Sequence, residues 1–144
     1  MATIVADIPE RFWQITYDQA HDPDSPDLCP MAQGANCQNF AYEILRHFGL
    51  HVPYLRSSNL WDDTEHTTIA DEFRALDLLL FNRTEKAWGA HVALHVGEGQ
   101  AIHLSKKIGT PVVWPIARFH EQPEYAILIG AKRVKGQSGV GARD

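Results

Sequence analysis

The chain has 144 residues, the length of one ordinary domain, and 44% of them are hydrophobic, which is enough for a globular core. With 13 basic and 18 acidic side chains its net charge is −5, and no basic run or arginine-rich helix is present, so we expect no nucleic-acid partner. The composition also excludes an intrinsically disordered chain and, with only two cysteines, a disulfide-stapled miniature protein.

The sequence predicts neither a membrane span nor a secretory signal. No segment approaches the roughly 18 consecutive apolar residues of a membrane span, and residues 1–15 mix apolar with charged side chains. We therefore expect a chain that is cytoplasmic as translated, with a non-standard secretion route as the means of export if it acts outside the cell. In a reducing compartment Cys29 and Cys37 are expected to be free thiols rather than one short disulfide.

The first part of the chain predicts two helices separated by a long loop. Apolar residues at helical spacing within residues 1–20 indicate a short leading helix. Residues 21–34 contain three prolines, three aspartates and a glycine, which is typical of a loop and often of one that borders a site. A strong helical period then predicts a helix over residues 37–48, with Asn36 as its N-cap and Gly49 as its end.

The rest of the chain predicts strands. Residues 51–76 are interrupted by proline, serine, asparagine and aspartate, so they are predicted as loop with short helical turns. Helix followed by strands indicates an α+β domain over residues 1–134, and the polar, glycine-rich residues 135–144 are expected to form a flexible tail. The predicted strands, arranged as an antiparallel meander, are 77–81, 91–96, 101–104, 111–116 and 125–133.

Cys37 is the first candidate for chemistry because it begins the most strongly predicted helix. The unpaired amides and the dipole at a helix start favour the thiolate and can donate hydrogen bonds to an oxyanion. We therefore expect the pKa of this thiol to be lowered. The alternative interpretation is a small buried apolar residue.

A thiol nucleophile needs a base, and His91 and His103 lie on two successive predicted strands. The register of the hairpin between them decides whether their rings can meet. A two-residue turn at Glu98 and Gly99 would place the two histidines on opposite faces of the sheet. A three-residue loop that begins at Gly97 would instead place them on one face as diagonal neighbours, which would complete the nucleophile, base and orienting residue of a thiol hydrolase.

A metal site is the competing interpretation, because His91, His95 and His103 offer three imidazoles. Residues four apart on a strand lie about 13 Å apart, too far to bind one ion at about 2.1 Å without a sharp bend. We therefore predict no metal site and no cofactor. His95 is interpreted as a strand histidine near the end of the sheet.

Five segments in this order resemble the NlpC type of papain-like cysteine peptidases, and they fall within residues 34–134. GANCQNFAYEILRHFGLHVP resembles the family's nucleophile helix, LRSSNLWDD the connection after it and DLLLF its first strand. HVALHVGEGQAIHLS resembles its histidine-bearing hairpin, and YAILIGAKRV its closing strand. The resemblance implies an α+β, papain-like fold in which the nucleophile helix packs on an antiparallel sheet of about five or six strands.

The resemblance also implies roles for three side chains. Cys37 is the nucleophile, His91 the general base and acid, and His103 the third polar residue, which orients His91. Because the family's best-known activity is cutting amide bonds in bacterial cell-wall stem peptides, we predict a thiol-dependent hydrolase of amide bonds. The expected enzyme is a peptidoglycan stem-peptide endopeptidase or amidase, acting as a cell-wall hydrolase or a secreted effector.

Substrate-binding residues are predicted less directly. The family's aromatic and glycine stretch upstream of the nucleophile is absent, which leaves Tyr17 as the candidate for its substrate-binding tyrosine. Asn36 stands where the family usually has aspartate. Arg56 and Ser57 follow the helix in a polar loop, where a guanidinium can meet a carboxylate of an acidic stem peptide.

Two other function classes stay open. One keeps the chemistry but makes the substrate intracellular, as an amidase, isopeptidase or acyltransferase; the Asn-Cys-x-x-Phe sequence also resembles the lecithin:retinol acyltransferase branch of the same superfamily. The other is a non-catalytic binding module on this fold. The expected partners are a peptide or peptidoglycan fragment and, for a secreted effector, an immunity or inhibitor protein.

Overall fold

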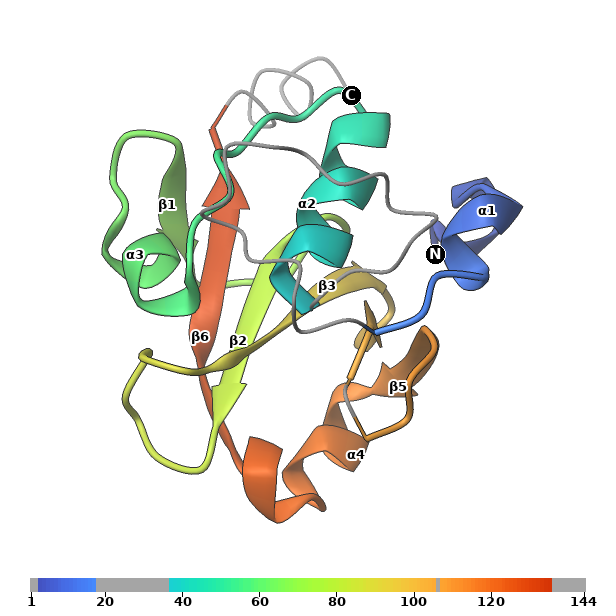
Figure 1. Ribbon diagram of the computed structural model, residues 1–144. Helices are drawn as coiled ribbons and strands as arrows, with labels where there is room; N and C mark the ends of the chain where they lie inside the picture. The colour runs from blue at the N-terminus through green and yellow to red at the C-terminus, as the bar shows by residue number, and fades with distance from the viewer. Residues whose placement is uncertain (1–2, 18–36, 106, 136–144) are drawn as a thin grey trace.

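The computed structural model describes residues 3–17, 37–105 and 107–135, and its centre is a six-stranded antiparallel sheet (Figure 1). The strand order is β1-β6-β2-β3-β4-β5. The strands are β1 Thr67–Ala70, β2 Leu78–Asn82, β3 His91–Gly97, β4 Gln100–His103, β5 Val112–Pro115 and β6 Ile127–Val134. The helical elements are η1 Val5–Asp7, α1 Glu10–Trp13, α2 Cys37–His47, α3 Ser57–Asp62, α4 Ile116–His120 and η3 Pro123–Tyr125. This arrangement confirms the predicted α+β class.

All five predicted strands are present with ends within two residues of the prediction, but the meander is only partly correct. Strands β2 to β5 follow one another across the sheet, whereas β6 returns to pair with the other edge of β2. Strand β1 was predicted as loop. This strand is short, and its residue Ile69 is exposed, so its sequence lacks the pattern of a half-buried strand. Its backbone pairing with β6 stabilises it as a strand.

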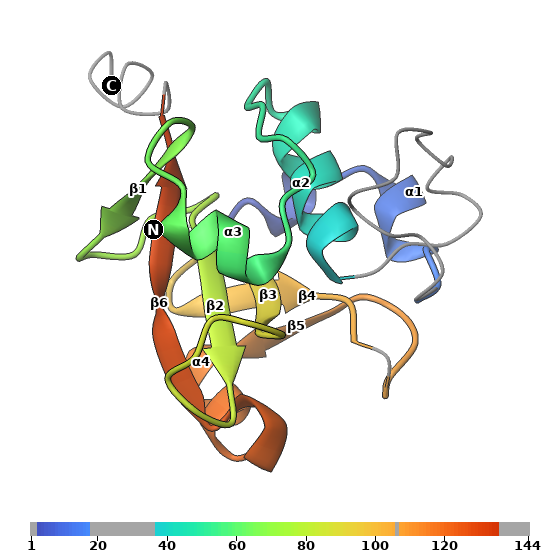
Figure 2. The same ribbon diagram turned by 60° about the vertical axis from the view of Figure 1, so that its left-hand side comes forward.

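Helix α2 covers one face of the sheet, where it lies over β3 and β4 (Figures 1 and 2). The predicted period is confirmed, because its apolar side chains are buried against the strands in one cluster that includes Phe40, Ile44, Leu45, Leu80, Val92 and Leu94. The opposite face has a smaller cluster, in which Phe81 of β2 stacks on Phe119 of α4 with ring centroids 4.3 Å apart. The two faces are therefore covered by different helices.

The predicted leading helix is broken into η1 and α1, and Pro9 stands immediately before α1. Phe12 of α1 packs edge-on against Phe40 of α2, and Ile4 donates a backbone hydrogen bond to Val96 of β3. These contacts fasten the start of the chain to the face that α2 covers. No helix in the three described ranges is long and apolar enough to cross a membrane.

Candidate active site

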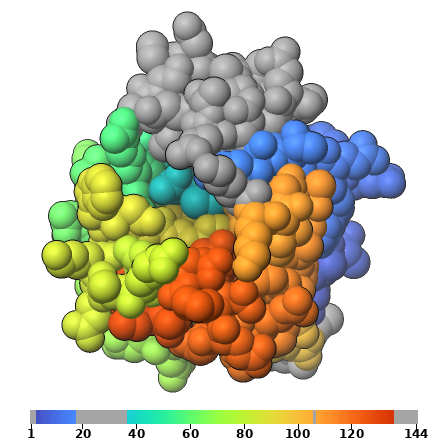
Figure 3. All heavy atoms as spheres, turned by 60° about the horizontal axis from the view of Figure 1, so that its bottom comes forward, coloured from blue at the N-terminus to red at the C-terminus, as the bar shows by residue number. Residues whose placement is uncertain are grey.

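Cys37 is the first residue of α2 and lies in a surface pocket of about 650 Å³. In Figure 3 the start of α2 lies at the floor of a hollow, between the β2–β3 loop on one side and the segments around Lys107 and Tyr125 on the other. Cys37 is buried and its thiol is free. The residues that line the pocket are Tyr17, Cys37, Gln38, Asn82, Arg83, Gly89, Ala90, His91, Lys107, Glu124 and Tyr125.

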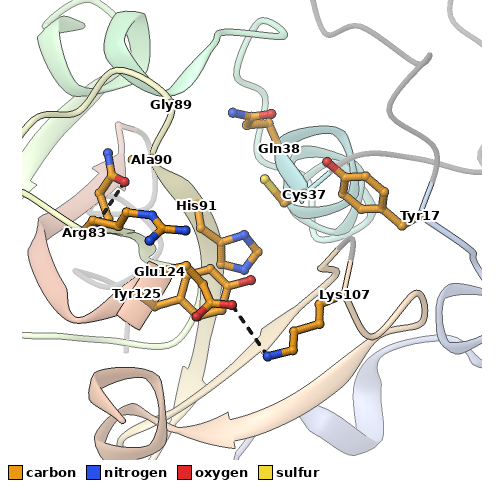
Figure 4. A pocket seen from close by; sticks show the side chains of 11 residues that line it. Tyr17, Cys37, Gln38, Arg83, Gly89, Ala90, His91, Lys107, Glu124 and Tyr125 are labelled. Atoms are coloured by element: carbon orange, nitrogen blue, oxygen red, sulfur yellow. Dashed lines mark hydrogen bonds and ion pairs between the residues drawn. The ribbon is translucent and has the colours of Figure 1, made fainter. Parts of the chain in front are cut away.

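His91 enters the same pocket because it is the first residue of β3, at the end of the sheet. Its Nε2 atom lies 2.9 Å from Nδ1 of His103 on β4, and the two rings are nearly perpendicular. The two histidines therefore lie on one face and in contact, as the second of the two predicted registers requires. Figure 4 shows the Cys37 sulfur and the His91 ring on neighbouring walls of the pocket.

The hairpin that joins these strands combines the two registers that the sequence left open. Gly97 pairs with Gln100 across Glu98 and Gly99, both of which have positive φ, so the turn itself has two residues. A β-bulge between His95 and Gly97 then shifts the register by one, so that further along Leu94 pairs with Ile102. The bulge thus returns His91 and His103 to one face, which a two-residue turn alone would prevent.

A cradle of aromatic rings holds the histidine pair, and the sequence reasoning did not find it. Tyr125 stacks on His91 with centroids 4.5 Å apart. The His103 ring packs against Trp114 and Phe119, with ring centroids 4.4 and 4.6 Å away. These three aromatic residues come from β5, α4 and η3, all downstream of the histidines. In the sequence they could have been noticed only as a concentration of aromatic residues in 114–125.

Burial sets the charge state of the site. It lowers the pKa of His91 to about 3. It also lowers the pKa of His103 to about 2, with smaller contributions in the same direction from the charges of His91 and Arg118. Both imidazoles are therefore neutral at pH 7, the form in which a histidine can accept a proton.

The pKa of the Cys37 thiol differs from the prediction. Burial raises the pKa of the Cys37 thiol to about 11, while the backbone N–H groups of Val92, Gln38 and Cys37 itself lower it by less. The expectation of a thiolate was wrong for the resting site, because removing the sulfur from water outweighs the amides at the helix start. The resting pair is a neutral thiol and a neutral imidazole.

The hydrogen bond between the two histidines determines which ring atom can serve the thiol. With Nε2 of His91 engaged by His103, Nδ1 is the atom left to accept a proton from Cys37. That role requires the His91 tautomer with its proton on Nε2, donated to Nδ1 of His103. His103 must then carry its own proton on Nε2, which is buried and has no hydrogen-bond partner in the described part of the chain. The rings of Trp114 and Phe119 pack against the His103 ring that carries this N–H.

Cys37 and His91 line the same pocket, but these two described side chains are not hydrogen-bonded to each other. The amide of Val92, next to His91, is the strand group that acts on the sulfur. Catalytic hydrogen bonds are often long before substrate binds. The arrangement can therefore perform general-base activation of a thiol once a substrate brings the two groups into line.

The predicted substrate-binding residues have different outcomes. Tyr17 lines the pocket, where burial and the neighbouring Cys37 raise the pKa of its hydroxyl. Arg56 and Ser57 do not line it, because they lie at the start of α3 and Ser57 is buried there. Asn36 and Cys29 lie outside the described residues, as do residues 136–144 of the predicted tail.

The pocket carries charged residues that the sequence reasoning missed. Arg83 in the β2–β3 loop lies beside His91 in Figure 4, and Lys107 and Glu124 form an ion pair at 3.9 Å across the pocket rim. Arg83 is thus an arginine in the pocket wall, the place predicted for Arg56. Within the described ranges, no cluster of three histidine, cysteine or acidic side chains could hold a metal ion.

Comparisons with known proteins agree with this fold. The model of the NlpC/P60 family matches residues 25–122. No curated protein matches the chain. Among solved structures, an NlpC/P60 family protein from Bacillus cereus is 21% identical with a TM-score of 0.54, over 71% of this chain and 32% of its own, so the chain spans about a third of that protein's length.

Two further structures are similar over most of the chain. The NlpC/p60 domain of the peptidoglycan hydrolase SagA is 21% identical with a TM-score of 0.54, over 81% of this chain and 90% of that one. The peptidoglycan hydrolase RipB from Mycobacterium tuberculosis is 18% identical with a TM-score of 0.54, over 92% of this chain and 70% of its own. At these identities the likeness establishes the fold.

Proposed function

Because the chain belongs to the NlpC/P60 family, whose model covers more than half of it, we propose that it is a cell-wall hydrolase that cleaves amide bonds in peptidoglycan stem peptides. Two structural neighbours are peptidoglycan hydrolases, which supports this substrate class. The observation that supports the chemistry most is the 2.9 Å hydrogen bond between His91 and His103 in the wall of the pocket that contains a free Cys37 thiol.

In the proposed reaction, Nδ1 of His91 accepts the proton of Cys37 as the sulfur attacks the carbonyl carbon of the substrate amide. Backbone amides at the start of α2 donate to the oxyanion that forms. The imidazolium then gives its proton to the departing nitrogen as the C–N bond breaks, which leaves a thioester on Cys37. Water, deprotonated by His91, attacks the thioester, and the sulfur regains its proton as the acid leaves.

The neutral resting state fits this sequence of proton transfers. A thiol with a raised pKa is a poor nucleophile alone, and an imidazole with a lowered pKa is a weak base alone. When substrate is bound, the developing thiolate and imidazolium stabilise each other, and the hydrogen bond to His103 holds the imidazolium in place. Cys37 and His91 are therefore both uncharged at rest and become an ion pair during the reaction.

Digestion of purified peptidoglycan, with the fragments identified by mass spectrometry, tests the proposal. Wild-type protein should release fragments with a new amine and a new carboxyl end within the stem peptide, and the Cys37→Ala protein should release none. Intact sacculi after prolonged incubation, together with hydrolysis of a non-peptidoglycan amide or transfer of an acyl chain, would replace this substrate by one of the alternatives in the same superfamily.

A further inference from the structure

A second cavity, of about 370 Å³, adjoins the pocket of Cys37 and shares three lining residues with it. The shared residues are Lys107, Glu124 and Tyr125. The ion pair between Lys107 and Glu124 therefore lies on the boundary between the two spaces. Because the two spaces adjoin, a substrate that extends beyond the reacting amide can occupy the pocket of Cys37 and the second cavity at the same time.

Arg118 gives this second cavity its chemical character. Its guanidinium lies over the Trp114 ring, 4.6 Å from the centroid. Trp114 is itself buried and packed against His103 and Phe119, so the guanidinium rests on a fixed support. A guanidinium stacked in this way keeps its planar edge of N–H donors available for a partner in the same plane.

The charges around Arg118 leave it without a matching anion. Glu124, the acidic residue that lines the second cavity, is already 3.9 Å from Lys107. Within the described ranges no carboxylate forms an ion pair with Arg118. The guanidinium geometry suits a carboxylate, which can accept two parallel hydrogen bonds from it.

We propose, building on the hydrolase function above, that the second cavity is a subsite for a carboxylate on the substrate, bound by Arg118 on the support of Trp114, at a distance from the amide that Cys37 attacks. Gln122 lines the same cavity and offers a further polar group to the bound segment. The ligand class is a peptide that carries a free carboxylate outside the scissile bond, and the stem peptides of peptidoglycan meet this description.

Binding at this subsite also acts on the catalytic pair. The positive charge of Arg118 is one of the contributions that lower the pKa of His103. A carboxylate on Arg118 offsets that charge, so the imidazolium that forms at His91 and His103 during reaction becomes easier to form. The subsite therefore contributes to turnover as well as to affinity, which distinguishes it from a merely adhesive contact.

The experiment uses one set of stem-peptide fragments in two forms, with free carboxylates or with the same carboxylates converted to carboxamides. Dissociation constants are measured by calorimetry with the Cys37→Ala chain, which cannot turn the fragments over, alone and combined with Arg118→Gln, Arg118→Lys or Arg74→Gln. Arg74 is exposed and lines neither cavity, so the control substitution Arg74→Gln removes one positive charge away from the proposed subsite. The acidic form should bind about tenfold to a hundredfold more tightly than the amidated form, and Arg118→Gln should abolish that difference.

Arg118→Lys should restore only part of the preference, because an ammonium cannot form the paired hydrogen bonds, and Arg74→Gln should change nothing. Equal binding of the two forms, an equal preference in the Arg118→Gln chain, or no binding of either form would overturn the subsite. Cleavage of sacculi by the chain with wild-type Cys37 is scored separately. Cleavage without an Arg118-dependent preference refutes the subsite alone, whereas an Arg118-dependent preference without cleavage refutes the proposed hydrolase alone.

Discussion

The two faces of the sheet have different chemistry. The face under α2, here called the aliphatic face, is formed by Leu78, Leu80, Val92, Leu94, Val96 and Ile102. The opposite face, here called the aromatic face, carries Phe81, Trp114 and Phe119 around His103 and beside His91. Beneath α2 the aliphatic face buries mainly hydrocarbon side chains, whereas the aromatic face buries imidazoles whose hydrogen-bonding groups need particular partners.

The comparison explains where the site lies. Cys37 belongs to the cluster on the aliphatic face and the histidine pair belongs to the aromatic face, so the proposed nucleophile and the proposed base can meet only where the sheet ends. His91 satisfies this condition because it is the first residue of β3. One face therefore mainly stabilises the domain, the other mainly orients the base, and variants of each should separate these contributions.

The largest expected effect comes from removing the nucleophile or the base. Cys37→Ala and His91→Ala should each lower kcat/KM on stem-peptide fragments by about 10⁴-fold or more, because no other described group can take over either role. The thermal unfolding midpoint should change little for Cys37→Ala. His51→Ala, at an exposed histidine outside the pocket, is the control and should leave activity unchanged; substantial turnover by either site variant would contradict the assignment.

Removing the orienting residue should have a smaller effect. His103→Ala should lower kcat by about tenfold to a thousandfold while leaving KM nearly unchanged, because nucleophile, base and oxyanion donors remain. His103→Asn or His103→Gln should recover part of the loss, since an amide oxygen can accept the hydrogen bond from Nε2 of His91. If His103→Ala turned over like wild type, the pairing of the two rings would have no catalytic role.

Leu80 on the aliphatic face offers the opposite test. Leu80→Ala removes a fully buried side chain from the cluster under α2 and should lower the free energy of unfolding by about 2–5 kcal/mol. Its kcat, measured well below the unfolding midpoint, should stay within about twofold of wild type. Urea denaturation and steady-state kinetics on one preparation provide both numbers. A large loss of kcat in the folded variant would show that the two faces are not separable.

The last expected effect concerns stability alone and is its dependence on pH. The native pKa values of His91 and His103 lie far below the value of about 6.5 for an unfolded histidine, so the unfolded chain binds more protons as the pH falls. The stabilisation is complete above pH 6.5 and is lost as the pH decreases toward the native values. Between pH 7 and pH 5 each histidine should account for a loss of about 2 kcal/mol in the free energy of unfolding, so the pair should account for about 4 kcal/mol.

Urea titrations of wild type and the His91→Gln, His103→Gln double variant at pH 7, 6 and 5 measure this contribution. The double variant should show a flatter dependence on pH, because glutamine does not titrate. Identical slopes for the two proteins would mean that the histidines are not held neutral in the folded state.

The sequence was sufficient where local pattern determines structure. The apolar period after Cys37 fixes α2 and the face that it buries, and the alternating segments fix most of the strands within two residues. The order of Cys37, His91 and His103 identified three residues that do lie close to one another. The missing information concerned how the strands are arranged, since β1 and the return of β6 depend on backbone pairing rather than on side-chain period.

The rest of the site was hidden because topology creates it. Trp114, Arg118 and Tyr125 reach the histidines only when the chain after β4 folds back over the aromatic face. The raised pKa of Cys37 also depends on burial that no local motif reveals. Arg56 was predicted because it follows α2 in the sequence, but the arginine that lines the pocket is Arg83 in the β2–β3 loop.

The central claim is that Cys37 attacks the substrate and becomes acylated with help from His91. Acid-quenched mixtures of the protein and stem-peptide fragments, analysed by intact-protein and peptide mass spectrometry, test it most directly. We predict an adduct with the mass of the acyl portion on Cys37, removed by hydroxylamine and absent from the Cys37→Ala and His91→Ala proteins. Cleavage of the fragments by a protein whose Cys37 has been fully alkylated, with no adduct at any time, would contradict the account.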